Sequence, residues 1–340
     1  MTSHQLPRPG PIGITGAAEF LPEQVLASDE VQDRVVGAAG IDLPAGMFTQ
    51  LTGIGRRRVA RDDEYASTLA VGAARLALAR AGLRPTDIDL LIFASATRDV
   101  AEPATAHICQ AELGSQAHAI DVTNACNSFI NGIDIARAML LAGRGSRALV
   151  LTGETPTRAI RWQPASVEQL RRGIAGYTFG DAGAAVVVEP VRSGGIIDID
   201  TETRSEHWDV GGIFGGGSRH PRDLEYTYFE GDGHALRGVF EKIGTHIIDR
   251  VGERTAMAIT DYAKVLVHQV TVPYLDRFVE LTGVPPANLE VTVTELGNVA
   301  SATLGIQLAR VYDTLAAGDR VLLVGLGGGV SVMTMVWEKS

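Results

Sequence analysis

An internal duplication is the feature of this sequence that most constrains its fold. Leu91-Ile-Phe-Ala-Ser-Ala-Thr97 is matched later in the chain by Val265-Leu-Val-His-Gln-Val-Thr271, and each apolar run reads as a short strand followed by a helical stretch. The match continues, since helical patterns ending at Gly143 and Gly318 precede further apolar strand patterns. This alternation predicts two similar α/β halves, each with a mixed sheet covered on both faces by helices.

The two halves are predicted to meet within residues 192–217. We divide the chain into an N-terminal half, residues 1–200, and a C-terminal half, residues 201–340. A duplicated pair of domains naturally places a functional site at the junction between them.

Cys126 is the strongest candidate nucleophile. It lies in Asp121-Val-Thr-Asn-Ala-Cys126-Asn-Ser-Phe-Ile-Asn-Gly132, where small and polar residues lead into an apolar helix. Unpaired amide N–H groups and the macrodipole at a helix N-terminus stabilise a thiolate and can lower a thiol pKa from about 8.5 into the physiological range. The alternative interpretation is a small buried thiol without a chemical role.

Two polar residues in the second half complete a candidate set. His268 stands at the end of the strand pattern Lys264-Val-Leu-Val, and Asn298 lies in a polar turn before a stretch of small residues. Sites in α/β sheets assemble at the carboxyl ends of strands and at neighbouring helix N-termini. Taken singly, His268 could be a core histidine and Asn298 a helix cap. Together with Cys126 they form a Cys/His/Asn set typical of nucleophilic catalysis.

Composition favours a soluble enzyme. The chain has 340 residues, 45% of them hydrophobic, which is enough to bury a large core. A net charge of −10 argues against nucleic acid or an anionic membrane as the main partner. The two cysteines, Cys109 and Cys126, indicate a reducing compartment without a disulfide framework, and Cys109 is predicted to pack within a helix.

Targeting and membrane patterns are not expected in this chain. The first ten residues lack the charged and then apolar pattern of a signal peptide. The apolar stretch at residues 321–337 contains glycines and β-branched residues, which fit buried strands better than a membrane helix. We therefore expect a cytoplasmic protein without membrane insertion.

Several ordered motifs carry a resemblance to a known family. They are Ile14-Thr-Gly, Leu51-Thr-Gly-Ile-Gly, Asn124-Ala-Cys126, Phe179-Gly-Asp-Ala-Gly, Val267-His268-Gln, Gly297-Asn298 and Gly325-Leu-Gly-Gly-Gly329. With these motifs the chain, from about Ile12 to Trp337, resembles the thiolase-fold condensing enzymes of the β-ketoacyl-acyl carrier protein synthase III group. The resemblance implies an α/β thiolase-like fold of two duplicated halves in five layers.

The resemblance also implies roles for individual residues. Cys126 would carry the acyl group, its backbone N–H and that of Gly328 would form an oxyanion hole, and His268 with Asn298 would stabilise an enolate for Claisen condensation. Phe214, Gly327 and Gly328 are expected to bind substrate. We expect no metal and no permanently bound cofactor, because substrates arrive on coenzyme A or on the phosphopantetheine of an acyl carrier protein.

Glu102 is the candidate base. Ser95-Ala-Thr-Arg-Asp-Val-Ala-Glu102-Pro-Ala-Thr is most similar to the branch that joins two fatty acyl chains head to head, in which the matching Glu enters the site from the other subunit. This implies a homodimer. Deprotonation of an unactivated acyl chain needs such a base, whereas decarboxylation of a malonyl unit does not. The alternative is an exposed loop Glu before Pro103.

Several positions depart from the initiating synthases. Met47 and Leu51 stand where a Trp and an Arg usually meet coenzyme A. After His268-Gln269, an Ala-Asn pair and a following Arg are replaced by Val270, Thr271 and Pro273. Leu326 replaces an aromatic residue before the triple glycine. These changes favour specialised lipid or polyketide biosynthesis over fatty-acid initiation.

Other segments have two interpretations each. Residues 154–176 and 211–221 do not repeat and are predicted to cap the site, or else to form surface loops. Arg56, Arg57 and Arg58 would meet a substrate phosphate or form a solvated face.

Two further functions remain open. Cys126 could pass its acyl group to an oxygen or nitrogen nucleophile, which would need a wider and more polar second pocket. The protein could instead be a non-catalytic subunit that lends Glu102 across a heterodimer interface.

Overall fold

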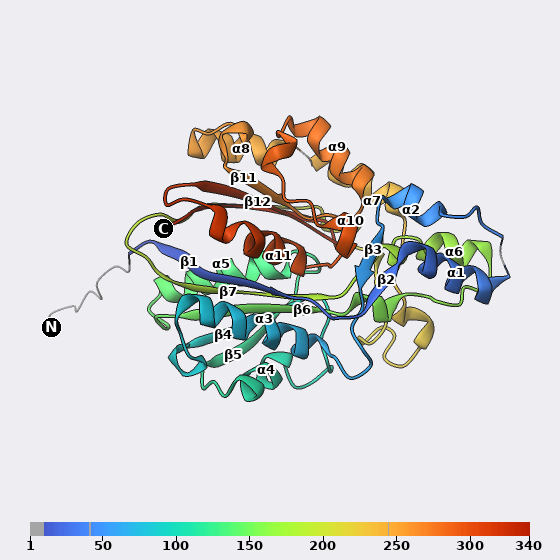
Figure 1. The fold of residues 1–340 in the computed structure, drawn as a ribbon, viewed down its shortest axis with the longest axis horizontal. Coiled ribbons are helices and arrows are strands. Elements are labelled where there is room, and N and C mark those ends of the chain that lie inside the picture. Colours follow the sequence, from blue (N-terminus) through green and yellow to red (C-terminus); the bar gives the residue numbers. More distant parts are fainter. Residues whose placement is uncertain (1–9, 41, 244) are drawn as a thin grey trace.

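The computed structural model describes residues 10–40, 42–243 and 245–340 and is shown in Figure 1. The first nine residues, for which the sequence predicts no signal peptide, lie outside the described residues. Two central sheets and the helices around them form the body of the molecule, and a smaller group of elements extends from one end (Figure 1).

The first half forms a five-stranded mixed sheet in the order β1-β7-β6-β4-β5. The pairs β4–β5 and β4–β6 are parallel, while β7 runs antiparallel to both β1 and β6. The inner strands are apolar along their length because helices cover both faces. The strands are β1 (Ile12–Phe20), β7 (Ala182–Pro190), β6 (Ala148–Glu154), β4 (Leu90–Ala94) and β5 (His118–Val122).

The second half repeats this arrangement in the order β11-β12-β13-β8. The pair β11–β12 is parallel, and β13 runs antiparallel to β12 and β8. A parallel bridge between Val265 and Leu289 occupies the place that β5 has in the first sheet. The strands are β11 (Lys264–Val267), β12 (Arg320–Gly327), β13 (Ser331–Glu338) and β8 (Gly195–Thr203).

The matching strand orders confirm the predicted duplication, with β1, β4, β6 and β7 corresponding to β8, β11, β12 and β13. β8 belongs to the second sheet and crosses residue 200. We therefore propose that the halves divide in the β7–β8 connection, at about residues 191–194, a few residues before the predicted division at residue 200.

Helices complete the five predicted layers (Figure 1). The outer helices α3 and α4 cover the first sheet, α8 and α9 cover the second, and α5 and α11 lie between the two sheets within one apolar core. Gly305 permits α11 to pack closely against β7, because a Cβ at position 305 would lie only 2.6 Å from the Cβ of Ala184. The helices are α3 (Ala66–Ala81), α4 (Thr105–Leu113), α8 (His246–Thr255), α9 (Val272–Thr282), α5 (Ser128–Leu141) and α11 (Ala302–Val311).

The remaining elements gather at the end where the site lies (Figure 1). They follow strand ends of the two sheets, which is where ligand sites form in α/β proteins. They are β2 (Val25–Ala27), α1 (Ser28–Ala39), α2 (Met47–Thr52), β3 (Arg56–Arg58), α6 (Val167–Gly173), β9 (Gly211–Gly212), β10 (Glu230–Gly231), α7 (Gly233–Ile243) and α10 (Val293–Leu296).

Candidate active site

Cys126 lies in the turn between β5 and α5, two residues before the helix begins at Ser128. The turn is fixed by its own hydrogen bonds, since the N–H of Asn124 donates to the Ser128 hydroxyl, which donates to the carbonyl of Ala125. Ala125 has a φ of 48°. A non-glycine residue in this left-handed region is strained, and such strain is concentrated at functional sites.

The surroundings of Cys126 correct one expectation from the sequence. Burial, and then the negative charge of Glu154, raise the pKa of the Cys126 thiol to about 12, although hydrogen bonds from the backbone N–H groups of Gly328 and Cys126 itself act to lower it. The predicted lowering of this pKa by the helix N-terminus is therefore wrong, because desolvation of the thiolate outweighs the hydrogen bonds. In a single chain these surroundings favour the thiol over the thiolate.

The glycine turn from the second half lies directly against the cysteine turn. A Cβ on Gly328 would lie 3.7 Å from the Cβ of Ala125, and one on Gly327 would lie 3.2 Å from the carbonyl oxygen of Asn124. Glycine at position 327 lets the two backbones approach, and the backbone N–H groups of Gly328 and Cys126 act to lower the pKa of the thiol. Val330, in the same turn before β13, also has a positive φ, of 56°.

His268 follows β11 and is buried, with 3% of its surface exposed. Its backbone N–H donates to the carbonyl of Val324 on β12, which leads into the glycine turn. Burial lowers the pKa of the imidazole to about 4, so the ring is neutral at neutral pH. Its buried Nδ1 has no hydrogen-bond partner among the described residues.

Asn298 lies in the buried turn between α10 and α11. Its backbone N–H donates to the carbonyl of Thr178, and its own carbonyl accepts from the N–H of Gly180. The side-chain oxygen accepts from the backbone N–H of Ala300 at 3.0 Å, and this assignment leaves the –NH2 group as a donor. Ala300 has a φ of 47°, a second strained alanine beside a predicted site residue.

Glu154 is a site residue that the sequence analysis did not identify. It ends β6, it is completely buried, and its charge acts on the thiol of Cys126. Burial raises the pKa of Glu154, although hydroxyl and backbone donors surround its carboxylate. An acidic residue directly after the apolar run Ala148-Leu-Val-Leu-Thr-Gly was the available signal in the sequence.

Glu102 stands apart from this group in a single chain. It is exposed in the loop between β4 and α4, at a cis peptide bond to Pro103. It is not among the groups whose charge acts on Cys126. The turn of Gly328 therefore packs against the turn of Cys126, and the charge of Glu154 acts on its thiol, but Glu102 is not brought to the same point in a single chain.

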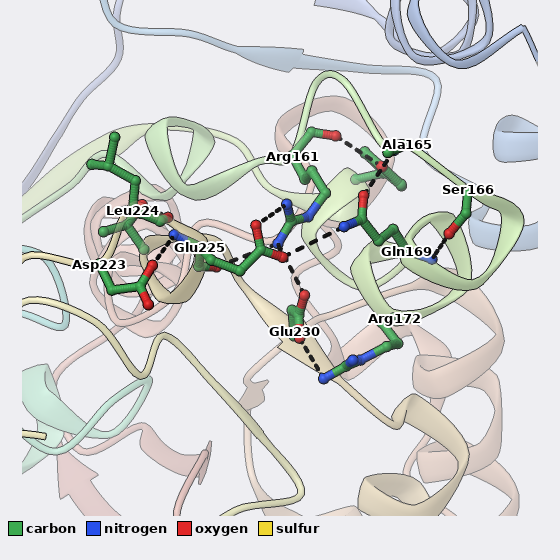
Figure 2. A network of polar contacts seen from close by, with 11 residues as sticks. Arg161, Ala165, Ser166, Gln169, Arg172, Asp223, Leu224, Glu225 and Glu230 are labelled. Carbon is green, nitrogen blue, oxygen red and sulfur yellow. Dashed lines mark hydrogen bonds and ion pairs between the residues drawn. The ribbon is translucent and has the colours of Figure 1, made fainter. Parts of the chain in front are cut away.

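A charged network joins the predicted cap segment 154–176 to residues 225–230, which follow the second predicted cap segment, 211–221 (Figure 2). Arg161, with 6% of its side chain exposed, pairs with Glu225 at 2.8 Å and with Glu230 at 3.0 Å. Arg172 pairs with Glu230 at 2.7 Å, and the Arg161 guanidinium lies over the ring of Tyr228. Partly buried, shared ion pairs of this kind fix a segment more firmly than single surface pairs do.

The second cap segment reaches the glycine turn. The carbonyl oxygen of Gly211 would lie 3.8 Å from a Cβ on Gly328. Phe214, predicted to bind substrate, is half-buried in this segment and packs edge-on against Trp208.

An apolar cavity lies between α7, α9 and the ends of β12 and β13. Arginine side chains stand among its lining residues, and its walls are mainly aromatic and aliphatic. Representative lining residues are Arg237, Phe240, Tyr274, Phe278, Leu326 and Val332.

The three consecutive arginines do not form one basic surface. Arg57 is buried, with 1% of its surface exposed, and donates to the Ser28 hydroxyl and the carbonyls of Tyr177 and Phe179. Arg58 donates to the carbonyls of Pro22 and Glu23. Arg57 is therefore a structural residue, which excludes the predicted phosphate contact for it.

Within the described residues, no helix is long and apolar enough to cross a bilayer. The same residues contain no cluster of three or more His, Cys, Asp or Glu side chains able to hold a metal ion.

Two family models match the chain. The model of 3-oxoacyl-[acyl-carrier-protein] synthase III matches residues 120–205, which contain Cys126. The model of the C-terminal part of the same synthases matches residues 253–339, which contain His268 and Asn298.

Individual proteins are similar over nearly the whole chain. A β-ketoacyl-[acyl-carrier-protein] synthase III of Symbiobacterium thermophilum is 31% identical and covers 97% of this chain and 99% of its own. The corresponding synthase of Hyphomonas neptunium is 32% identical and covers 94% of this chain and 96% of its own. A variant of Xanthomonas campestris OleA, crystallised with lauric acid and lauroyl-CoA, has a TM-score of 0.87 and 28% identity over 96% of this chain and 99% of its own. A cerulenin-bound OleA also has a TM-score of 0.87 and 28% identity, with 99% of both chains covered.

Proposed function

This chain belongs to the 3-oxoacyl-[acyl-carrier-protein] synthase III family, and from that premise we propose that it joins two acyl thioesters by Claisen condensation through an acyl group held on Cys126. It is a thiolase-fold condensing enzyme of the acyltransferase class, as its relatives and structural neighbours are. The predicted family is thereby confirmed.

One observation carries the proposal. The turn of Gly328, from the second half, packs against the turn of Cys126, from the first, and the backbone N–H groups of Gly328 and Cys126 act to lower the pKa of the thiol. Two backbone donors beside a nucleophile are the arrangement that stabilises the oxyanion of a tetrahedral intermediate. A buried structural cysteine has no need of such donors.

In the first half-reaction, the sulfur of Cys126 would attack the carbonyl carbon of an acyl thioester. The N–H groups of Cys126 and Gly328 would hold the oxyanion, and the carrier thiol would leave with the proton that Cys126 gives up. Because the resting thiol has a pKa of about 12, its deprotonation has to accompany substrate binding or attack.

In the second half-reaction, His268 and Asn298 would bind the carbonyl oxygen of a second thioester. Neutral imidazole and a side-chain amide can each donate one hydrogen bond to the developing enolate oxygen. The enolate carbon would attack the acyl carbon on Cys126, and the sulfur would leave as a β-ketoacyl product forms.

We propose fatty acyl chains as the substrate class. The lauric acid and lauroyl-CoA bound to the OleA variant support this choice. Coenzyme A and acyl carrier protein are both candidate carriers, and specialised lipid biosynthesis is the proposed setting.

We further propose that Glu102 acts in a neighbouring subunit of a homodimer. Its exposure in a single chain supports this role, because a base must lie in a covered site to act on an acyl chain. β5 is an exposed edge strand of the first sheet, and such edges pair readily with another copy.

Lauroyl-CoA tests the proposed function. The purified protein is incubated with lauroyl-CoA, and its intact mass and the small-molecule products are recorded by mass spectrometry. The expected result is one lauroyl group on Cys126 followed by a β-ketoacyl product. Transfer of the acyl group to an alcohol or amine, without carbon–carbon bond formation, would contradict the proposal.

A further inference from the structure

The carboxylate of Glu154 connects two segments that are far apart in the sequence. One oxygen accepts from the backbone N–H of Ala96 at 2.7 Å and from the hydroxyl of Ser301. The other accepts from the backbone N–H of Thr97 at 3.1 Å and from its hydroxyl at 2.9 Å. Each oxygen thus has two donors, and the side chain is completely buried.

Each of these segments leads to a residue of the proposed second half-reaction. Thr97 is the third residue of the β4–α4 loop, in which Glu102 follows five residues later. Ser301 comes three residues after Asn298, and its hydroxyl also contacts that of Thr152 on β6 at 2.8 Å. The carboxylate of Glu154 therefore holds the β4–α4 loop, at Thr97, against the turn after Asn298, at Ser301.

From this geometry we propose that Glu154 is a positioning residue for condensation, which fixes the loop of Glu102 relative to the turn of Asn298. The proposal rests on the function proposed above for these two residues. It assigns to Glu154 no contact with substrate, and its effect is transmitted through Ala96, Thr97 and Ser301.

A side chain needed only for packing would not have to be an acid at this position. Within the described part of the chain, no arginine or lysine pairs with Glu154, so neutral donors alone bond its two oxygens. When the carboxyl is ionised, its charge acts on Cys126 and disfavours the thiolate. An acid here makes the nucleophile harder to ionise, yet it supplies both acceptor oxygens that the two segments require.

Two substitutions distinguish the effect of the side-chain length of Glu154 from the effect of its charge. Glu154→Gln keeps the length but replaces one acceptor oxygen with an –NH2 group, which cannot accept from Ala96 or Thr97. Glu154→Asp keeps the charge but shortens the side chain. We expect both to slow condensation of the preformed acyl-enzyme on the order of 10²-fold, the scale of a misplaced reacting group. Only Glu154→Gln should move the alkylation of Cys126 by iodoacetamide to lower pH, since a nearby negative charge is lost.

Asp181→Asn is the matched control for the alkylation profile. Asp181 is also completely buried and accepts from the backbone N–H groups of Ala60 and Thr157 and from the Thr157 hydroxyl. Its charge is not among those that act on Cys126, so Asp181→Asn should leave the profile unchanged.

If the Glu154 variants do not fold, Ser301→Ala and Thr97→Val each remove one hydroxyl contact of the carboxylate, and both should slow condensation more than acylation. Unchanged condensation in every folded variant of this group would overturn the positioning role. Failure of the wild-type protein to form an acyl-enzyme would instead contradict the proposed function, while the alkylation profile would still report the charge of Glu154.

Discussion

Gly328 packs against Ala125, the residue before Cys126, although the two belong to opposite halves of the duplicated fold, and a Cβ on Gly328 would lie 3.7 Å from that of Ala125. Both contributing turns contain non-glycine residues with positive φ, Ala125 and Val330. Such conformations persist only where surrounding structure holds them. The contact therefore depends on correct packing of one half against the other, and a stable fold of either half alone would not provide the site.

We predict that Cys126→Ala abolishes acyl transfer to the protein. The wild-type protein should gain one lauroyl group from lauroyl-CoA, and the variant none, as measured by intact mass. Cys109→Ala is the control, because Cys109 is completely buried in α4 and burial raises its pKa strongly. A lauroyl group found on Cys109 would contradict the assignment of the nucleophile.

His268→Ala and Asn298→Ala are predicted to impair the second half-reaction. Either change removes a donor for the enolate oxygen, and loss of one such donor costs on the order of 10²-fold or more in rate. Acyl-enzyme formation should remain close to the wild-type rate in both variants. Rapid-quench measurements of acyl-enzyme and product give the two rates separately, and equal loss of both rates would refute this division of roles.

The duplication was sufficient to predict two similar α/β halves from sequence, while the arrangement in five layers was implied by the family resemblance. The patterns around Leu91 and Val265 place equivalent strands, β4 and β11, next to equivalent partners, β6 and β12. Strands buried on both faces have continuous apolar sequences, so their periodicity is readable without a structure. Only the counterpart of β5 in the second half has no strand pattern in the sequence, because it is reduced to a single bridge at Leu289.

The electrostatics of the site could not be predicted in the same way. A helix N-terminus argues for a low thiol pKa at Cys126, but its burial and the neighbouring Glu154 are consequences of tertiary packing. Likewise, Arg57 belongs to a run of three arginines that indicates a basic surface. Its side chain is instead buried, because β3 pairs with β2 and directs alternate residues to opposite faces.

We predict that His268 makes the protein less stable in mild acid. Burial lowers its pKa to about 4, whereas an unfolded histidine titrates near 6.5, so below about pH 6.5 protons bind the unfolded chain first. The free energy of unfolding should fall by roughly 2 to 3 kcal/mol from this residue between neutral pH and about pH 4.5. Urea unfolding at both pH values, for the wild type and for His268→Asn, measures this contribution.

The comparison with His268→Asn is needed because other groups oppose the effect. Burial raises the pKa of Asp181 to about 6, so its proton binds the native state first and favours folding as the pH falls. That contribution is the same in both proteins and cancels in the difference. An equal loss of stability in the two proteins would show that His268 does not titrate as its burial requires.

The final prediction concerns the source of the enolate. If Glu102 deprotonates an unactivated acyl chain, Glu102→Gln should stop condensation and leave acylation of Cys126 intact, because the amide keeps the shape but cannot accept the proton. If decarboxylation forms the enolate instead, the change should have little effect, and labelled carbon dioxide should leave a malonyl donor in step with product. Product yield and released label, measured in the same reaction, decide between the two.

A mixing experiment then tests whether Glu102 acts across a dimer interface. Cys126→Ala and Glu102→Gln are each expected to be inactive in condensation as homodimers. In a mixed dimer, one site would combine an intact Cys126 with Glu102 of the partner subunit, so activity should return to at most about half of that of the wild-type dimer, since only one of its two sites is complete. Subunit exchange is verified by native mass spectrometry. A mixture with confirmed mixed dimers but no more activity than its components would refute the action of Glu102 between subunits.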